Sequence, residues 1–462
     1  MLKDERWPVA RLIPISSASG IEAQERRAAS ALLAVVSAVP EFGRALLRPL
    51  GAPAGDIEAF IEVPFKVEGR TIRPDGVVVV SRGQKTWGAI LEAKVGSSGL
   101  EGSQMDQYLD LARDLGFDAV LTISNQYVTS SSEYPVIVDR RKLRRTRLHH
   151  WSWITVLTEA VLQKEHRGVT DPDQAYILGE LIRYLSDPRS GAVAFDSMGA
   201  SWTRIRDGAR QRTLRRNDPD VASLAGRWDE LIRYLCLELT KDLGQDVRHI
   251  VPKNQRTPAA RLGALSQSLA DSGRLDAQLN VPNAAGPLDV IADLRARQVI
   301  VSTRIDAPAT GTSKGRVSWL LRQLTEAPDD LSIEARLARS QSSLAAPIRL
   351  LRESPSEMYP ESGRQIRQFV VSVTRNMGVK RDATPGSFIH SVVSTTKEFY
   401  REVLQNLRAW KAPPPKLKEA KKEEPGVEEV PPQMAEGIRA AEAEQSEETT
   451  PQPDSEPDGG PE

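Results

Sequence analysis

The chain has 462 residues with 62 basic and 62 acidic side chains, so its formal net charge at neutral pH is zero. This length allows two or three domains, and no run of 18 apolar residues predicts a membrane-spanning helix. The chain has one cysteine, which excludes disulfides within the chain and cysteine-based zinc sites. This residue, Cys236, lies in an apolar segment and is expected to be a core thiol. The N-terminal residues lack the pattern of a signal peptide, so we expect a cytoplasmic protein that does not contact a membrane.

Charge is unevenly spread along the chain. From Lys411 to the end there are 6 basic and 14 acidic residues, a net charge of −8, which leaves +8 for residues 1–410. A basic body with an acidic tail suits a nucleic-acid-binding protein whose tail competes for its own basic surface; the alternative is a tail that only keeps the protein soluble. Residues 411–462 contain too few apolar side chains to pack, and we expect them to be disordered.

The first elements of the chain are predicted by capping and proline signals. Ser19 and Glu22 have the spacing of a capping box, which predicts a helix from here to about Val39, where Pro40 ends it. Residues 41–56 predict a shorter helix and a loop. Residues 57–67 predict a strand, in which Pro64 indicates an edge position or a bulge.

The strongest chemical signal is a predicted hairpin. Asp75 precedes an apolar run at residues 77–80, and after a polar break a second apolar run, residues 87–95, carries Glu92 and Lys94. Side chains two apart on a strand point to the same face. A carboxylate and an ammonium on an apolar strand are costly to bury without partners, and Asp75 across the hairpin is the obvious one.

Two carboxylates that meet beside a lysine predict a site for a hard cation. Magnesium prefers one or two protein carboxylates together with waters and phosphate oxygens. A bound metal lowers the pKa of its water and stabilises charge on a phosphate. Lys94 would then orient or activate the water, or stabilise charge in the transition state.

A helix and a strand follow the hairpin. The helix is predicted from a second capping-box spacing at residues 98–101 to Leu115, with Gly116 ending it, and Gln104 and Tyr108 share one of its faces. Residues 118–124 predict the next strand. Strand, helix and strand in this order form a right-handed parallel crossover, so we expect an α/β core with a mixed sheet flanked by helices.

These residues resemble the PD-(D/E)XK nuclease superfamily. The resemblance rests on Pro74-Asp75, then Glu92-Ala93-Lys94, then Gln104 to Tyr108, which is similar to the QxxxY motif of an exonuclease-like branch. It implies a nuclease-like core that uses Mg²⁺ or Mn²⁺ to hydrolyse phosphodiester bonds of nucleic acid, with DNA preferred. The alternative for Glu92 and Lys94 is a structural ion pair on a half-exposed strand.

The resemblance also implies roles for single residues. Asp75, Glu92 and the Ala93 carbonyl would bind the metal, and Lys94 would serve the attacking water or the scissile phosphate. Superfamily members often place a further acid on the first helix, which implies Glu25.

Two residues of the helix after the hairpin are further candidates, and a plainer explanation stays open for Tyr108 and for Glu25. Gln104 would help to hold the catalytic lysine or the metal's waters, and Tyr108 would contact substrate phosphate. The alternative for Tyr108 is packing in the core, and for Glu25 a solvated acid beside Arg26.

A basic segment follows the core motifs. Residues 136–139 suggest a further strand, after which six basic residues fall within eight positions, followed by His149, His150, Trp151 and Trp153. Basic residues beside aromatic ones suit phosphate contacts and base stacking; the alternative is a charged edge strand protected against aggregation. The histidines lack a third ligand at useful spacing and predict no metal site. The nucleic-acid contacts proposed are Arg140, Arg141, Lys142, Arg144, Arg145 and Arg147.

The rest of the chain predicts further domains. We expect a nuclease-like domain at residues 1–155, a mainly helical region at 156–250, a second and smaller α+β domain at 251–410, and the acidic tail. Residues 258–326 predict a helix, three strands and a helix, an order that echoes the nuclease core. Because the third strand has no Glu-x-Lys, an unrelated α+β domain is preferred over a degenerate second copy. Residues 330–410 predict helices with breaks.

The function expected is that of a metal-dependent nuclease. The alternative is a catalytically inactive module with the nuclease fold that binds nucleic acid or another protein. The oligomeric state stays open, a homodimer included.

Overall fold

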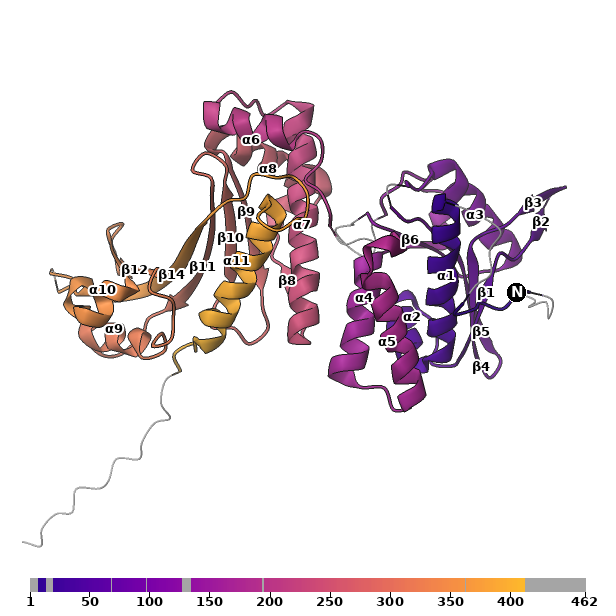
Figure 1. Cartoon of the computed structure of the whole chain (residues 1–462), viewed down its shortest axis with the longest axis horizontal. Coiled ribbons are helices and arrows are strands. Elements are labelled where there is room, and N and C mark those ends of the chain that lie inside the picture. The colour runs from indigo at the N-terminus through magenta and orange to yellow at the C-terminus, as the bar shows by residue number, and fades with distance from the viewer. Residues whose placement is uncertain are drawn as a thin grey trace, which may run out of the picture. The chain divides into compact units, whose positions relative to one another are not determined.

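The computed structural model describes residues 7–13, 20–67, 69–96, 98–126, 134–192, 195–361 and 363–411. The tail expected to be disordered lies outside the described residues except for Lys411, and so does Ser19 of the predicted capping box. The described chain is a mixed α/β protein with a five-stranded sheet, a seven-stranded sheet and a small two-stranded one (Figure 1).

The five-stranded sheet is mixed, as the sequence predicts. Its order is β1-β4-β5-β6-β7, in which β1, β4 and β5 are antiparallel while β5, β6 and β7 are parallel. The predicted hairpin and the predicted crossover are therefore both present. The strands are β1 (Asp56–Ile61), β4 (Gly76–Arg82), β5 (Lys85–Ala93), β6 (Ala119–Ser124) and β7 (Arg147–Ser152).

Helices cover both faces of this sheet, which explains why its strands are almost continuously apolar. Val78 and Val80 of β4 pack into one core with α1 (Gly20–Ala38) and α2 (Pro40–Leu47). Val77 and Val79 point to the other face and pack with α3 (Gly102–Leu115). The strand that carries Glu92 is thus enclosed between two hydrophobic layers.

Three predictions about this part of the chain are wrong in detail. The strand expected at 57–67 is broken, because Glu62 adopts φ 48° and Val63 and Pro64 separate β1 from β2 (Phe65–Val67), which pairs with β3 (Arg70–Ile72). Residues 136–139 form no strand; the strand begins later, at Arg147. The helix α3 begins after Glu101, not at a cap on Ser98, and it has no side-chain cap bond.

The helices expected between 154 and 240 are present, but they belong to two cores. Leu178 of α5 packs with the first sheet, whereas Trp202 of α6 and Trp228 of α7 pack with the second. Cys236 is a buried thiol of α7, as expected. The elements are α4 (Trp153–Val161), η3 (Leu162–Arg167), α5 (Pro172–Ser186), α6 (Trp202–Gln211) and α7 (Pro219–Leu243).

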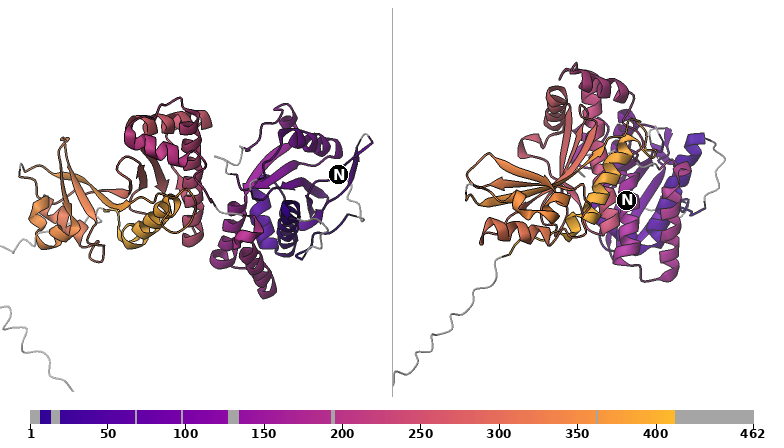
Figure 2. Two further views of the ribbon diagram at one scale, coloured as in Figure 1. Left: turned by 45° about the horizontal axis from the view of Figure 1, so that its top comes forward. Right: turned by 60° about the vertical axis from the view of Figure 1, so that its left-hand side comes forward.

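The seven-stranded sheet is antiparallel throughout, in the order β13-β12-β14-β11-β10-β9-β8. Its strands, coloured from magenta to orange, are seen from two further directions in Figure 2. The elements predicted at 258–326 are present. The helices predicted at 330–410 are largely wrong, because this stretch supplies three strands before its final helix. The elements are β8 (Arg248–His249), α8 (Pro258–Ser272), β9 (Arg274–Asn280), β10 (Leu288–Asp293), β11 (Gln298–Asp306), α9 (Ser313–Leu321), β12 (Ser332–Leu337), β13 (Ser343–Pro347), α10 (Ile348–Glu353), β14 (Ile366–Asn376) and α11 (Phe388–Glu402).

The pairing of β11 distinguishes this sheet from the five-stranded one. In the first sheet the second hairpin strand, β5, pairs in parallel with the strand that follows the helix. In the second sheet β11 pairs with β14 in an antiparallel arrangement. The second sheet is therefore an α+β arrangement of a different topology, in agreement with the preferred expectation.

Among the described helices, none is by itself long and apolar enough to cross a membrane.

Candidate active site

The hairpin brings Asp75 beside the end of β5. Because Gly76 pairs with Leu91, Asp75 lies next to residues 92 and 93 of the neighbouring strand. The Ala93 N–H donates a hydrogen bond of 2.8 Å to Asp75 Oδ2. The N–H and C=O of one strand residue point to the same side of the strand, so the Ala93 carbonyl also faces the Asp75 side.

Lys94 joins two carboxylates from different elements. Its Nζ lies 2.9 Å from Glu92 Oε1 and 3.4 Å from Oε2 of Glu25 on α1. The main chain of this lysine is fixed as well, because its N–H donates to the Ile123 carbonyl and its carbonyl accepts from Trp153 Nε1 at 2.8 Å. Glu25, which the sequence could assign only by resemblance, therefore lies at the same site as Lys94.

The two polar residues of α3 bind Glu92. The Tyr108 hydroxyl donates to Glu92 Oε2 at 2.9 Å, and Gln104 Nε2 donates to Glu92 Oε1 at 3.0 Å. Gln104 Nε2 also lies 3.1 Å from the Tyr108 oxygen. The ring of Tyr108 packs in the core and its hydroxyl holds the carboxylate, so the core-packing alternative is correct for the ring. The expected contact of this hydroxyl with substrate phosphate stays a prediction.

Crowding of buried charges determines the protonation at this site. Burial, and then the charge of Glu92, raise the pKa of Asp75 to about 7, although the Ala93 N–H and Lys94 lower it. Burial by itself lowers the pKa of Lys94, but Glu92, Asp75 and Glu25 together raise it above its ordinary value. Burial and Glu92 raise the pKa of Tyr108. Lys94 is therefore a lasting cation and Tyr108 a neutral hydroxyl at physiological pH.

The donor set fits a divalent cation of the magnesium type. Asp75 and Glu92 are close enough to raise the pKa of Asp75, and a cation between them would relieve that repulsion. Among the described residues, no group of three or more His, Cys, Asp or Glu is arranged to hold a metal. Asp75, Glu92 and the Ala93 carbonyl would therefore leave the remaining positions to waters and phosphate oxygens, a composition that Mg²⁺ accepts.

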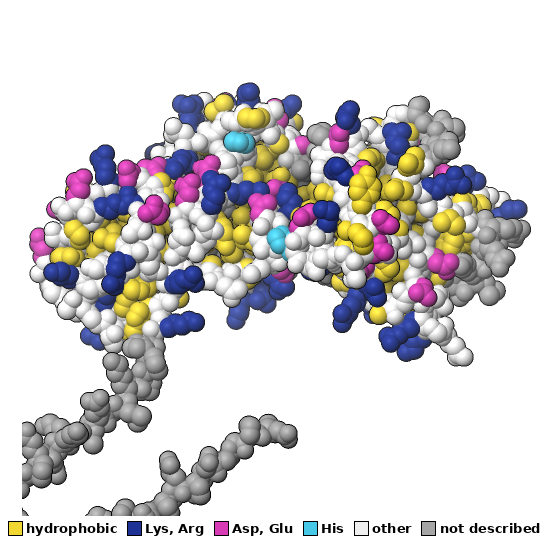
Figure 3. Space-filling view, turned by 60° about the horizontal axis from the view of Figure 1, so that its bottom comes forward, with side chains coloured by type: hydrophobic (Ala, Val, Ile, Leu, Met, Phe, Trp, Pro, Cys, Tyr) yellow, Lys and Arg dark blue, Asp and Glu magenta, His cyan; other side chains and the backbone are white. Residues whose placement is uncertain are grey.

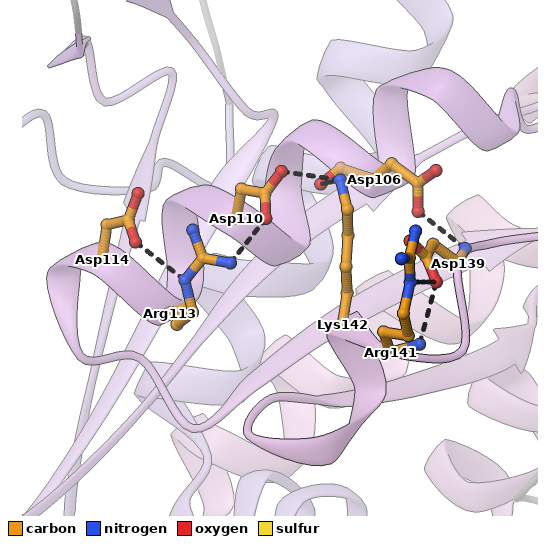
Figure 4. Close-up of polar contacts among 7 residues, drawn as sticks. All are labelled: Asp106, Asp110, Arg113, Asp114, Asp139, Arg141 and Lys142. Atoms are coloured by element: carbon orange, nitrogen blue, oxygen red, sulfur yellow. Dashed lines mark hydrogen bonds and ion pairs between the residues drawn. The ribbon is translucent and has the colours of Figure 1, made fainter.

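Arg147, at the end of the basic segment, does not lie at the level of these acids. Arg147 pairs with Ala119, whereas Thr122, three residues further along β6, is the residue opposite Glu92. Lys142 Nζ binds Asp110 of α3 at 2.6 Å, and Arg141 binds Asp139 (Figure 4). The exposed basic side chains of the segment that remain are Arg140, Arg144, Arg145 and Arg147.

The aromatic residues after the basic segment are buried, so the expected base stacking is wrong for them. Trp153 is 1 % exposed and Trp151 is also buried. His150 binds Thr122 Oγ1 through Nδ1 at 2.8 Å and the Gln126 carbonyl through Nε2 at 3.0 Å. The role of Trp153 in positioning Lys94 has no local signal in the sequence, because the contact joins residues 59 positions apart.

In the second sheet, the residue placed like Asp75 has a different environment. Asp289 accepts hydrogen bonds from Gln278 and Arg304 of the neighbouring strands. The side chains bonded to it are thus an amide and a guanidinium. This region therefore repeats the order of elements without the chemistry.

Basic side chains are not gathered into one continuous patch on the face drawn in Figure 3, where Lys and Arg are interspersed with acidic and hydrophobic side chains. Comparison of the chain with protein-family models, curated proteins and solved structures finds no match.

Proposed function

We propose that the protein is a metal-dependent nuclease that hydrolyses phosphodiester bonds of nucleic acid, with DNA the preferred substrate. The observation that carries this proposal is the convergence of Asp75, Glu92 and Lys94, the three residues of the sequence motif. A structural ion pair between Glu92 and Lys94 would not require the second carboxylate, Asp75, beside it.

The arrangement of elements supports the same proposal. A helix, an antiparallel hairpin, a crossover helix and a parallel strand are what the resemblance to PD-(D/E)XK nucleases implies. The site lies where β5 ends, next to the start of α3. Glu92, Gln104 and Tyr108 are on regular elements, and Asp75 and Lys94 directly adjoin β4 and β5, which hold a geometry more firmly than loops do.

Each side chain of the site has a task that its contacts suit. When bound, Mg²⁺ or Mn²⁺ would supply an activated water and neutralise charge on the phosphate. Glu92 is held by Lys94, Gln104 and Tyr108, so its orientation is fixed before substrate arrives. Lys94 is a lasting cation, and it would therefore orient water or stabilise the phosphate rather than accept a proton.

The test is cleavage of linear, circular and single-stranded DNA with and without Mn²⁺. Lys94→Ala is expected to lower the rate by at least about 10²-fold, as loss of one charge-stabilising group does in other enzymes. Lys85→Ala, at the exposed start of the same strand, is the matched control and should cut normally. Lys94→Met retains the apolar stem and guards against loss of the fold. Cleavage by both Lys94 variants at the wild-type rate would refute the proposal.

The second candidate function is a nucleic-acid-binding or protein-binding module that does not cut. The specific observation in its favour is that both oxygens of Glu92 already accept hydrogen bonds from side chains. This candidate predicts salt-sensitive binding that EDTA does not alter, and no products with either metal.

A further inference from the structure

A hollow of about 480 Å³ lies at the start of the parallel strands, at the other end of β5 from Glu92. It is lined by Trp87 at the start of β5, by the residues that link α3 to β6, and by the residues that enter β7. Trp87 and Glu92 are five positions apart on one strand, which corresponds to roughly 17 Å. The two sites therefore cannot contact the same phosphate group.

The hollow carries an excess of positive charge. Arg113, Arg145 and Arg147 line it, together with one acid, Asp118, whose Oδ2 accepts a hydrogen bond from the Gly88 N–H. Arg113 is already paired with Asp110 and Asp114 of α3 (Figure 4). Within the described ranges, Arg145 and Arg147 have no acidic partner, so two guanidinium groups remain for a ligand.

The second observation is the buried hydroxyl of Thr146, the residue between these two arginines in the sequence. Thr146 lines the hollow and is 1 % exposed, and its Oγ1 has no hydrogen-bond partner among the described residues. A buried hydroxyl without a partner costs roughly 1–3 kcal/mol. Such a group calls for an explanation, and a bound ion or water that supplies the missing bond is one.

The backbone makes room for the arginine at one wall. Gly51 adopts φ 101°, which a residue with a side chain rarely adopts, and a Cβ built here would stand 3.4 Å from Arg147 Nη1. The guanidinium thus lies close against the main chain. Two features oppose the binding of an anion here. They are the Asp118 carboxylate and the C-terminal end of α3, where the helix dipole is negative.

We propose that this hollow binds a phosphate group, with Arg145 and Arg147 as charge partners and Thr146 as hydrogen-bond partner. Guanidinium groups bind tetrahedral oxyanions through paired N–H donors, and charge-assisted bonds of this kind are stronger than neutral ones. The phosphate is either the end or backbone of a nucleic acid or a free phosphate ion. The inference does not depend on the proposed hydrolysis.

The first experiment uses inorganic phosphate as the probe and thermal unfolding of the full chain as the readout. Phosphate should raise the midpoint of the wild-type protein beyond potassium chloride of equal ionic strength. Arg147→Ala and Arg145→Ala should each weaken phosphate binding about tenfold, the loss of one charge-assisted contact. Arg82→Ala is the matched control, because Arg82 is an exposed arginine of the same sheet that does not line the hollow.

Thr146→Val separates binding from folding. Valine has the same shape without the hydroxyl, so the unliganded variant should be as stable as the wild type or more stable, while its phosphate affinity falls. Binding that is equal in wild type, Thr146→Val and Arg147→Ala, or a phosphate effect no larger than that of chloride, would overturn the proposal.

A second arm distinguishes the sources of the phosphate. Two labelled single-stranded oligonucleotides, with a 5′-phosphate and with a 5′-hydroxyl, are compared on the wild type and on Arg147→Ala. A preference for the 5′-phosphate that Arg147→Ala removes assigns the hollow to a nucleic-acid end. Without such a preference, two outcomes remain. If Arg147→Ala lowers binding of both oligonucleotides equally, the hollow is assigned to a backbone phosphate. If Arg147→Ala lowers binding of neither, it is assigned to free phosphate.

Discussion

At the scale of single residues, the site depends on how Glu92 is held. This carboxylate is 2 % exposed, and three side chains from two elements surround it. A buried charge that loses one partner destabilises the fold far more than an exposed one does. The same contacts that stabilise the core therefore fix the orientation that the proposed chemistry needs, so that a variant at Lys94 must be judged on both properties.

Buried His150 predicts a pH dependence of stability. Burial lowers the pKa of His150 to about 4 from an ordinary value of 6.5, although its bond to the Gln126 carbonyl raises it. The unfolded chain therefore takes up the proton more readily than the folded one between these pH values. Stability that is fully present above pH 6.5 is lost as the pH falls to about 4, by about 3 kcal/mol for this group.

Urea unfolding between pH 7.5 and 4 measures this dependence. His150→Gln, a neutral side chain that can still donate to the Gln126 carbonyl, should reduce the slope between pH 6.5 and 4. His249 titrates in the same window, because burial lowers its pKa to about 4 as well, so His249→Gln is the comparison and should remove a separate part of the slope. A slope that is unchanged in His150→Gln would show that this histidine does not titrate as described.

At the scale of elements, local signals predicted most of the first sheet and α3. The apolar runs beside Asp75 and Glu92 are long and end at turn residues, so both strands of the hairpin were predicted. The break at Glu62 was missed, because a positive φ at a glutamate has no signal in the sequence. The stretch 330–410 failed for another reason: β14 finds its partners β11 and β12 at distant positions, and local periodicity does not report such pairing.

The site was predicted as far as short-range patterns allowed. Asp75, Glu92 and Lys94 stand on one hairpin, and Gln104 and Tyr108 on the next helix, so spacing and resemblance together identified them. The basic segment was predicted from its composition to contact phosphate, and composition does not say where in the fold such a segment lies. Register decides this, because Arg147 enters β7 at the opposite end from the level of Glu92.

Gly43, near the junction of α1 and α2, lies where an added methyl group should destabilise the fold. The chain turns by 109° between these helices, and Pro40 cannot donate to the Val36 carbonyl. A Cβ at Gly43 would stand 2.3 Å from that carbonyl oxygen and 2.6 Å from Ile57 Cδ1. Gly43→Ala should therefore destabilise the protein by roughly 1–3 kcal/mol, the usual cost of overpacking, despite the better helix propensity of alanine.

The measurement is the midpoint of urea unfolding. Gly99→Ala is the matched control, because a Cβ there meets no atom within 4 Å and its φ is ordinary. This control should leave stability unchanged or slightly raised. Equal midpoints for both variants would mean that α2 shifts away from α1 at little cost.

At the scale of the whole chain, charge balance determines how strongly any nucleic acid is held. Residues 1–410 carry a net charge of +8 and the remainder −8. Several basic side chains of the body, among them Lys142 and Arg113, are committed to aspartates of α3. The positive charge that remains for an external polyanion is therefore modest, and an acidic segment on the same chain competes with the ligand for it.

A chain that ends at residue 410 should therefore bind DNA more tightly than the full chain, with the difference largest at low salt. The logarithm of the binding constant falls with the logarithm of salt concentration in proportion to the phosphates contacted. Fluorescence anisotropy of a labelled duplex, measured from 50 to 200 mM salt, tests this for both chains. A full-length chain whose 14 acidic residues after position 410 are changed to their amides is the control for length; its last 52 residues then carry +6, so it should bind DNA at least as tightly as the shortened chain. If the shortened chain binds no better but precipitates at lower concentration, the acidic segment serves solubility alone.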